Sequence, residues 1–96
     1  MKMLSTRGEV ILSAADSDLV GKDLREGKLH LQVTTEFYGN VRVSRETFVS
    51  SLKMCTIANL VGREAVDTAI AEGLVEPENV IFIGGIPHAQ YASLTQ

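Results

Sequence analysis

The run Val80–Ile83, four apolar residues between a proline turn and a glycine pair, most constrains what this chain can fold into. A half-exposed strand alternates apolar and polar residues, and this run does not. It therefore predicts a strand that is covered on both faces or lies at the centre of a sheet. The segment Gly84–Gln90 (GGIPHAQ) follows directly, and we expect it to form a polar loop at the end of that strand.

Two consecutive helices are predicted upstream. The first begins after Ser44, which offers an N-cap oxygen, and its apolar residues recur at helical spacing: Phe48, Leu52 and Cys55. The second extends over Ile57–Glu72, where two apolar ridges adjoin, and it ends at Gly73. The sequence leaves three alternatives open: Thr56 caps this helix, Asn59 caps it, or the two helices merge through a kink.

The N-terminal part predicts a β-hairpin of Met1–Ser5 and Glu9–Ala15, with Gly8 in the tight connection. A short helical segment is expected around Leu19–Leu24, with Gly27 as its C-terminal stop.

Apolar and polar residues alternate strictly in Leu29–Val33, which predicts a strand with one face exposed to water. His30 belongs to the polar face, so we expect it to be exposed. Tyr38–Asn40 is typical of a turn, after which Val41 and Val43 predict a brief strand.

The 96 residues fit one domain, 1–96, because no composition break divides the chain. The expected class is α+β, with a mixed sheet of four to five short strands and two consecutive helices packed on one face. Aromatic residues make up only 5% of the chain, so the core must be aliphatic.

The formal net charge of −3 argues against nonspecific nucleic-acid binding by the whole surface. The charge is uneven, however: residues 1–45 hold seven Lys or Arg against six Asp or Glu, and the remainder holds two against six. Five basic residues of the first part are candidates for a basic face: Lys22, Arg25, Lys28, Arg42 and Arg45. A mixed, solvated surface is the alternative, since acidic residues interleave with them.

Cys55 is the single cysteine, which excludes an internal disulfide, and its setting predicts a core position. No apolar run is long enough to span a membrane. We therefore expect a soluble, cytoplasmic protein without a membrane partner.

In the functional interpretation of the Gly84–Gln90 loop, the glycines and Pro87 fix the backbone so that His88 and Gln90 are presented rigidly. Asn59 then faces this loop. An ordinary turn, and a cap or buried amide at Asn59, are the alternatives. No companion ligands lie near His88 in sequence, so neither a metal nor a cofactor is expected.

Cys55, Asn59 and His88 supply the residue types of a thiol hydrolase, but no glycine-rich nucleophile motif surrounds the cysteine. Phe37 and Tyr38 form either a platform on which a base stacks or a hydrophobic plug.

Four stretches together, "LVGKDLREGKLHLQV", "FYGN", "TIANLVGREAV" and "VIFIGGIPHAQ", resemble the archaeal proteins grouped as domain of unknown function family 424. The resemblance extends from about Gly8 to Gln90. It implies no particular activity, cofactor or substrate. Members of that family tend to be encoded among translation and ribosome-biogenesis genes, so the resemblance implies work on RNA or the ribosome.

Our first hypothesis is a non-enzymatic accessory protein that docks on an RNA-protein assembly or a translation factor. The second is a small enzyme or small-molecule-binding protein with a site at His88 and Asn59, joined by a carboxylate such as Glu26 or Glu36. The third is a homodimer formed through the apolar strand and its loop. The candidate binding residues are Asn59, Pro87, His88, Gln90, Tyr38, Arg25, Lys22 and Lys28.

Overall fold

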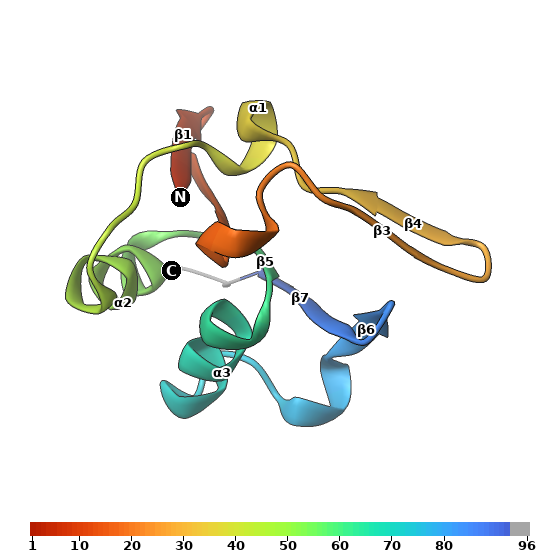
Figure 1. The fold of residues 1–96 in the computed structure, drawn as a ribbon. Helices are drawn as coiled ribbons and strands as arrows, with labels where there is room; N and C mark the ends of the chain where they lie inside the picture. Colours follow the sequence, from red (N-terminus) through yellow and green to blue (C-terminus); the bar gives the residue numbers. More distant parts are fainter. Residues whose placement is uncertain (93–96) are drawn as a thin grey trace.

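The computed structural model of the chain describes residues 1–92 and contains a five-stranded mixed sheet, a separate two-stranded sheet and three α-helices (Figure 1). In chain order the elements are β1 (Lys2–Thr6), β2 (Glu9–Ala15), the 3-10 turn η1 (Ser17–Leu19), β3 (Asp23–Glu26), β4 (Leu29–Gln32), α1 (Thr35–Tyr38), α2 (Arg45–Met54), β5 (Ile57–Val61), α3 (Arg63–Ala71), the 3-10 turn η2 (Pro77–Asn79), β6 (Ile81–Ile83) and β7 (Ile86–Ala92). The predicted α+β class is confirmed.

The strand order of the main sheet is β1-β2-β5-β7-β6, and only β2 and β5 are parallel neighbours. The predicted N-terminal hairpin is confirmed as β1 and β2, with Gly8 at a φ of 82° in its turn. Because β2 and β5 run in the same direction, the loops that follow them meet at one end of the sheet.

The predicted second helix is wrong over its first half, because Ile57–Val61 is the central strand β5. Both faces of this strand contribute to apolar clusters, and all of its residues except Asn59 are apolar, so they match helical spacing by coincidence. The second half of the prediction is confirmed as α3, beyond which Gly73 has a φ of 75°. The helices α2 and α3 are therefore separated by a strand and are not consecutive elements.

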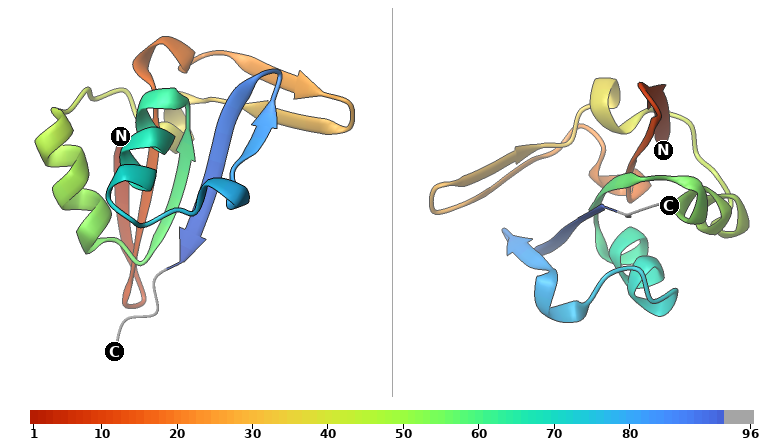
Figure 2. Two further views of the ribbon diagram at one scale, coloured as in Figure 1. Left: turned by 90° about the horizontal axis from the view of Figure 1, so that it is seen from below. Right: turned by 180° about the vertical axis from the view of Figure 1, so that it is seen from behind.

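The helix α2 begins where the sequence predicted, since the Ser44 side chain accepts a hydrogen bond from the Thr47 amide. Figures 1 and 2 show α2 and α3 on one side of the sheet and α1 on the other. Within the described residues, none of the helices combines the length and apolarity that a membrane span needs.

The run Val80–Ile83 is not a central strand, because β6 lies at the edge of the sheet. Ile81 is 47% exposed and Phe82 is 50% exposed, and only Ile83 is buried. The segment Gly84–Gln90 is not a loop either. Gly84 and Gly85 form a tight turn, and the remaining residues belong to β7. A homodimer through this strand stays a prediction.

The strands β3 and β4 form a hairpin, here called the arm (residues 23–32), which projects from the body in Figures 1 and 2. The predicted helix at Leu19–Leu24 is therefore wrong, because the chain leaves η1 and enters β3. Gly27 lies in the turn of the arm, and the predicted strand at Leu29–Val33 is confirmed as β4. The brief strand expected at Val41 and Val43 does not form, and both side chains are exposed.

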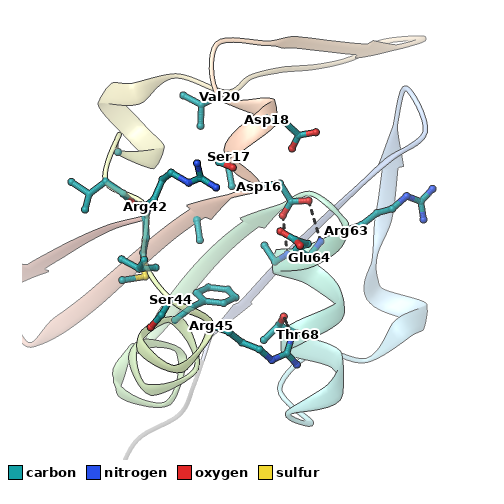
Figure 3. Close-up of a pocket in the computed structure, with 18 of the residues that line it drawn as sticks. Asp16, Ser17, Asp18, Val20, Arg42, Ser44, Arg45, Arg63, Glu64 and Thr68 are labelled. Atoms are coloured by element: carbon teal, nitrogen blue, oxygen red, sulfur yellow. Dashed lines mark hydrogen bonds between the residues drawn. The ribbon is translucent and has the colours of Figure 1, made fainter.

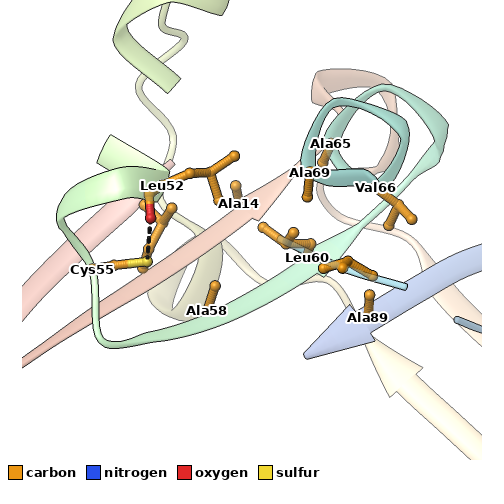
Figure 4. Packing of buried hydrophobic residues seen from close by; sticks show 11 residues of the cluster. Ala14, Leu52, Cys55, Ala58, Leu60, Ala65, Val66, Ala69 and Ala89 are labelled. Carbon is orange, nitrogen blue, oxygen red and sulfur yellow. Dashed lines mark hydrogen bonds between the residues drawn. The ribbon is translucent and has the colours of Figure 1, made fainter. Parts of the chain in front are cut away.

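Two apolar clusters lie on opposite faces of the main sheet. The first, the helix-side cluster, joins α2 and α3 to the sheet around Leu12, Leu52 and Leu60, all at most 1% exposed (Figure 4). The second, the arm-side cluster, consists of Leu19, Val33, Tyr38 and Val61. Neighbouring residues of β5 contribute to each, since successive side chains of a strand point to opposite faces.

Candidate functional site

The structure brings the predicted residues Asn59, His88 and Gln90 onto one face of two adjacent strands. Asn59 of β5 is paired with Gln90 of β7, and Val61 is paired with His88. The Gln90 Nε2 donates a hydrogen bond to the Asn59 Oδ1 at 2.6 Å. Pro87 is buried and belongs to the opposite face, because neighbours in a strand alternate. The convergence of the three polar side chains was predicted, although through a helix and a loop that do not exist.

The imidazole of His88 is half-buried, and its Nδ1 has no hydrogen-bond partner among residues 1–92. Desolvation by burial lowers the pKa of this histidine below its usual value. The ring is therefore neutral near pH 7. No group of three or more His, Cys, Asp or Glu gathers around a common point in the described part of the chain.

Cys55 is a core residue, as predicted. Its side chain is 3% exposed, and its Sγ donates to the Leu52 carbonyl at 3.2 Å and lies 3.3 Å from the Tyr91 hydroxyl. These contacts belong to the helix-covered face of the sheet, whereas His88 is on the other face. Cys55 and His88 therefore do not form a nucleophile–base pair.

The arm carries the predicted basic residues Arg25 and Lys28, and Lys22 directly precedes it; all three are exposed. Arg25 Nε donates to an Asp23 oxygen at 3.2 Å, and the exposed His30 ring bonds to the other oxygen of the same carboxylate. Desolvation acts to raise the pKa of Asp23, but the hydrogen bonds from His30 and Arg25 outweigh it and lower that pKa. One carboxylate thus orients two side chains on the outer face of the arm.

Tyr38 is only 2% exposed and lies in the arm-side cluster, so its ring cannot stack on a base. The hydrophobic-plug interpretation is the correct one for this residue. Phe37 packs edge-on against it, with ring centroids 4.9 Å apart, and remains 47% exposed.

A cavity of about 1050 Å³, here called the end cavity, lies at the carboxyl ends of β2 and β5 (Figure 3). Its walls come from Met1 and from residues within three ranges that are distant in sequence, 14–20, 39–48 and 63–71. None of the eight candidate binding residues lines it, whereas Arg42 and Arg45 of the predicted basic face do. In open sheets ligands favour the crevice beyond the carboxyl ends of strands, so this cavity is the principal candidate site.

Asp16 fixes one wall of the end cavity. Its two carboxylate oxygens accept the backbone amides of Glu64 and Ala65, at 3.0 and 2.9 Å, and so cap the N-terminus of α3. Gly62 permits this arrangement, because a Cβ at this position would lie 2.2 Å from the Asp16 Cγ. The carboxylate takes the place that a bound anion takes at other helix N-termini.

Three arginines border the end cavity and differ in what they contact. Arg45 Nη1 donates to the Thr68 hydroxyl at 3.1 Å. In Figure 3 Arg63 points away from the cavity, whereas Arg42 crosses it toward Ser17.

Sequence reasoning missed the end cavity because Ile57–Val61 was interpreted as helix. A strand that ends in a glycine and leads into a helix, as in "NLVGREAV", would have drawn attention to this end of the sheet. The sequence indicated Arg42 only as part of a basic face, because its position in the cavity depends on the path of the connection between α1 and α2.

Comparisons with known proteins are consistent with this description. A family model described as "Protein of unknown function (DUF424)" matches residues 4–94. A crystal structure of an uncharacterized conserved protein from Methanopyrus kandleri has a similar fold, with a TM-score of 0.81 and 21% sequence identity over 99% of this chain and 90% of that chain. At this identity the likeness shows the fold alone. No curated protein sequence matches the chain.

Proposed function

We propose that this chain, which belongs to the family described as protein of unknown function DUF424, is a non-enzymatic protein that binds a small molecule in the end cavity. The observation that carries the proposal is the position of the cavity at the carboxyl ends of β2 and β5. Ligand pockets have volumes of roughly 300–1,000 Å³ and combine an apolar lining with a few polar groups. The end cavity has this size, with Ala14 and Phe48 beside charged residues.

The hydrogen bonds of Asp16, the acidic residue nearest the carboxyl ends of β2 and β5, favour binding over catalysis. Both oxygens of Asp16 accept backbone amides, so this carboxylate is a structural cap and a poor general base. Asn59 and His88, the residues of our sequence-based site, line neither the end cavity nor the smaller cavity beside Lys22.

A cavity-blocking variant tests this proposal. Ser17→Trp places an indole in the end cavity, and Ser50→Trp makes the same change on an exposed part of α2 that does not line it. Thermal unfolding would be followed with a panel of amino acids, nucleotides, sugar phosphates and organic acids. A ligand at ten times its Kd adds about 1.4 kcal/mol, or several degrees in Tm for a domain of this size.

We expect at least one compound to raise the Tm of the wild type and of Ser50→Trp but not of Ser17→Trp. A panel without any stabilising compound, or equal stabilisation of both tryptophan variants, would count against a ligand in this cavity.

A second candidate function is docking on an RNA-protein assembly of translation in the cytoplasm, as our first sequence-based hypothesis stated. The arm favours it. Its basic residues are exposed, and Asp23 holds Arg25 in place, whereas residues 46–96 are strongly acidic. Positive side chains on a projecting element can reach phosphates that the acidic body would repel.

Charge reversal tests this second function. The double variant Arg25→Glu/Lys28→Glu alters the arm, and Arg7→Glu/Lys53→Glu makes the same total change elsewhere. Binding of oligouridine and of duplex RNA would be measured over a range of salt concentrations. We expect the arm variant to bind at least about tenfold more weakly, with a shallower salt dependence, while the control stays near the wild type. Equal loss in both variants would instead indicate an effect of net charge alone.

A further inference from the structure

Two arginines of the end cavity, Arg42 and Arg63, form no side-chain bond with residues 1–92, and of these only Arg42 extends into the cavity. Arg42 has no hydrogen bond or ion pair to any of residues 1–92, although its side chain crosses the cavity (Figure 3). Across the cavity stands Ser17, whose hydroxyl is also without a bond in this part of the chain. A guanidinium presents donors in a planar fork that matches the two oxygens of a carboxylate or phosphate.

We infer that the ligand of the end cavity carries an oxyanion group, a carboxylate or a phosphate, which Arg42 binds. This inference rests on the proposed function and names the chemical class of its ligand. Arg42 would provide the charged fork and Ser17 a further donor to the same group. The oxyanion does not bind at the N-terminus of α3, because the Asp16 carboxylate already accepts the amides there.

The other arginines of the cavity do not serve this purpose. Arg45 is bonded to Thr68, and this bond directs its guanidinium along α3 rather than toward Ser17. Arg63 points away from the cavity. The assignment to Arg42 alone makes the inference specific, because Arg63 provides a control of the same residue type on the same rim.

The acidic side chains of the cavity restrict the ligand further. Asp18, Glu64 and Asp67 line it, and their carboxylates accept no hydrogen bond from residues 1–92. They would weaken the binding of a bare oxyanion and would accept hydrogen bonds from hydroxyl or amino groups of a larger ligand. The ligand class is therefore a small molecule with an oxyanion at one end and hydrogen-bond donors at the other. The Phe48 ring, which also lines the cavity, offers contact to its apolar part.

The test uses the oxyanions themselves as probes. Backbone and arginine Nε–H signals of the ¹⁵N-labelled protein would be followed by NMR during titration with sodium phosphate and, separately, with sodium acetate. Sodium chloride at matched ionic strength controls for general salt effects. We expect saturable shifts at the Arg42 Nε–H and at the amides of Ser17 and Asp18. The anion that gives the lower Kd identifies the group.

The variants Arg42→Gln and Arg63→Gln then separate specific binding from surface charge. Arg42→Gln should weaken the better anion at least about tenfold, and Arg63→Gln should leave its Kd within about twofold. Shifts that never saturate, that chloride reproduces, or that both variants lose equally would overturn the inference. The Ser17→Trp comparison distinguishes the two failures, because a compound that stabilises the protein only when the cavity is open supports the proposed function even if Arg42 binds no anion.

Discussion

The chemistry of His88 depends on its neighbours more than on its own residue type. Its ring nitrogen Nδ1 is buried without a partner in the described residues, and burial disfavours the charged imidazolium. The other histidine of the chain, His30, is exposed and bonded to Asp23. A protonation event at His88 therefore costs folding free energy that an exposed histidine would not cost.

This difference predicts a pH dependence of stability. The folded-state pKa of His88 lies below its unfolded value of about 6.5, so the unfolded chain binds more protons between these two values. The free energy of unfolding should fall as the pH is lowered through about 6.5, by up to about 1.4 kcal/mol per pH unit, and His88 should contribute no further loss below its folded pKa. Urea unfolding of His88→Gln should show a smaller loss between about pH 7 and about pH 5 than the wild type.

The matched control is Gln90→Ala on the same strand, which changes no titratable group and should keep the wild-type pH dependence. If His88→Gln lost stability with falling pH as steeply as the wild type, other groups would be responsible for the slope.

At the scale of elements, the sequence predicted helix or strand correctly where one face of the element is exposed to solvent. It did so poorly where both faces are buried. The hairpin of β1 and β2, the alternating strand β4 and the capped helix α2 follow from local patterns. By contrast, β5 has apolar residues on both faces, with Asn59 as its one polar residue, and its apolar spacing continues into that of α3, which predicts a single helix that does not form. The local sequence pattern does not encode which strands are neighbours in a sheet. For this reason the run Val80–Ile83 predicted a central strand, whereas β6 lies at the edge of the sheet.

The junction between β5 and α3 depends on a contact across 46 positions of the chain, Asp16 to Gly62. Gly62 has a φ of 108°, and a side chain there would also overlap the Asp16 carboxylate. Gly62→Ala should therefore destabilise the protein by about 2–4 kcal/mol, since it combines backbone strain with a displaced cap. Asp16→Ala, which loses only the cap, should cost about 1–2 kcal/mol.

The double variant Asp16→Ala/Gly62→Ala isolates the contact. Because Asp16→Ala removes the atoms that the new Cβ would overlap, the double variant should be more stable than the sum of the single effects implies, by at least about 1 kcal/mol. Additive effects in denaturant unfolding would mean that the strain of Gly62 is purely local to its backbone.

At the scale of the whole molecule, the site could not be predicted because no local stretch contains it. The row of Asn59, Gln90 and His88 joins two strands that are paired, and motif reasoning could associate these residues. The end cavity instead needs the loop after β2, the connection after α1 and the first turns of α3 to meet. These three segments meet because β2 and β5 pair in parallel, and this pairing joins residues that are distant in the sequence.

The strand β5 also links the two apolar clusters, because its Leu60 packs in the helix-side cluster and its Val61 in the arm-side cluster. We therefore expect residues 1–92 to unfold as one cooperative unit. Val33→Ala in the arm-side cluster should cost about 2–3 kcal/mol and Leu60→Ala about 2–5 kcal/mol, with unchanged m-values in urea. Leu29→Ala, at a position 46% exposed on the arm, is the control and should cost less than about 0.5 kcal/mol.

Coincident transitions in far-ultraviolet circular dichroism and tyrosine fluorescence would accompany this result, because Tyr38 reports on the arm-side cluster and Tyr91 on the helix side. If Val33→Ala produced a separate early transition in fluorescence, the arm-side layer would be an independently unfolding cap. The walls of the end cavity that belong to residues 15–20 and 39–44 would then open without loss of the sheet, and ligand binding would stabilise that early transition selectively.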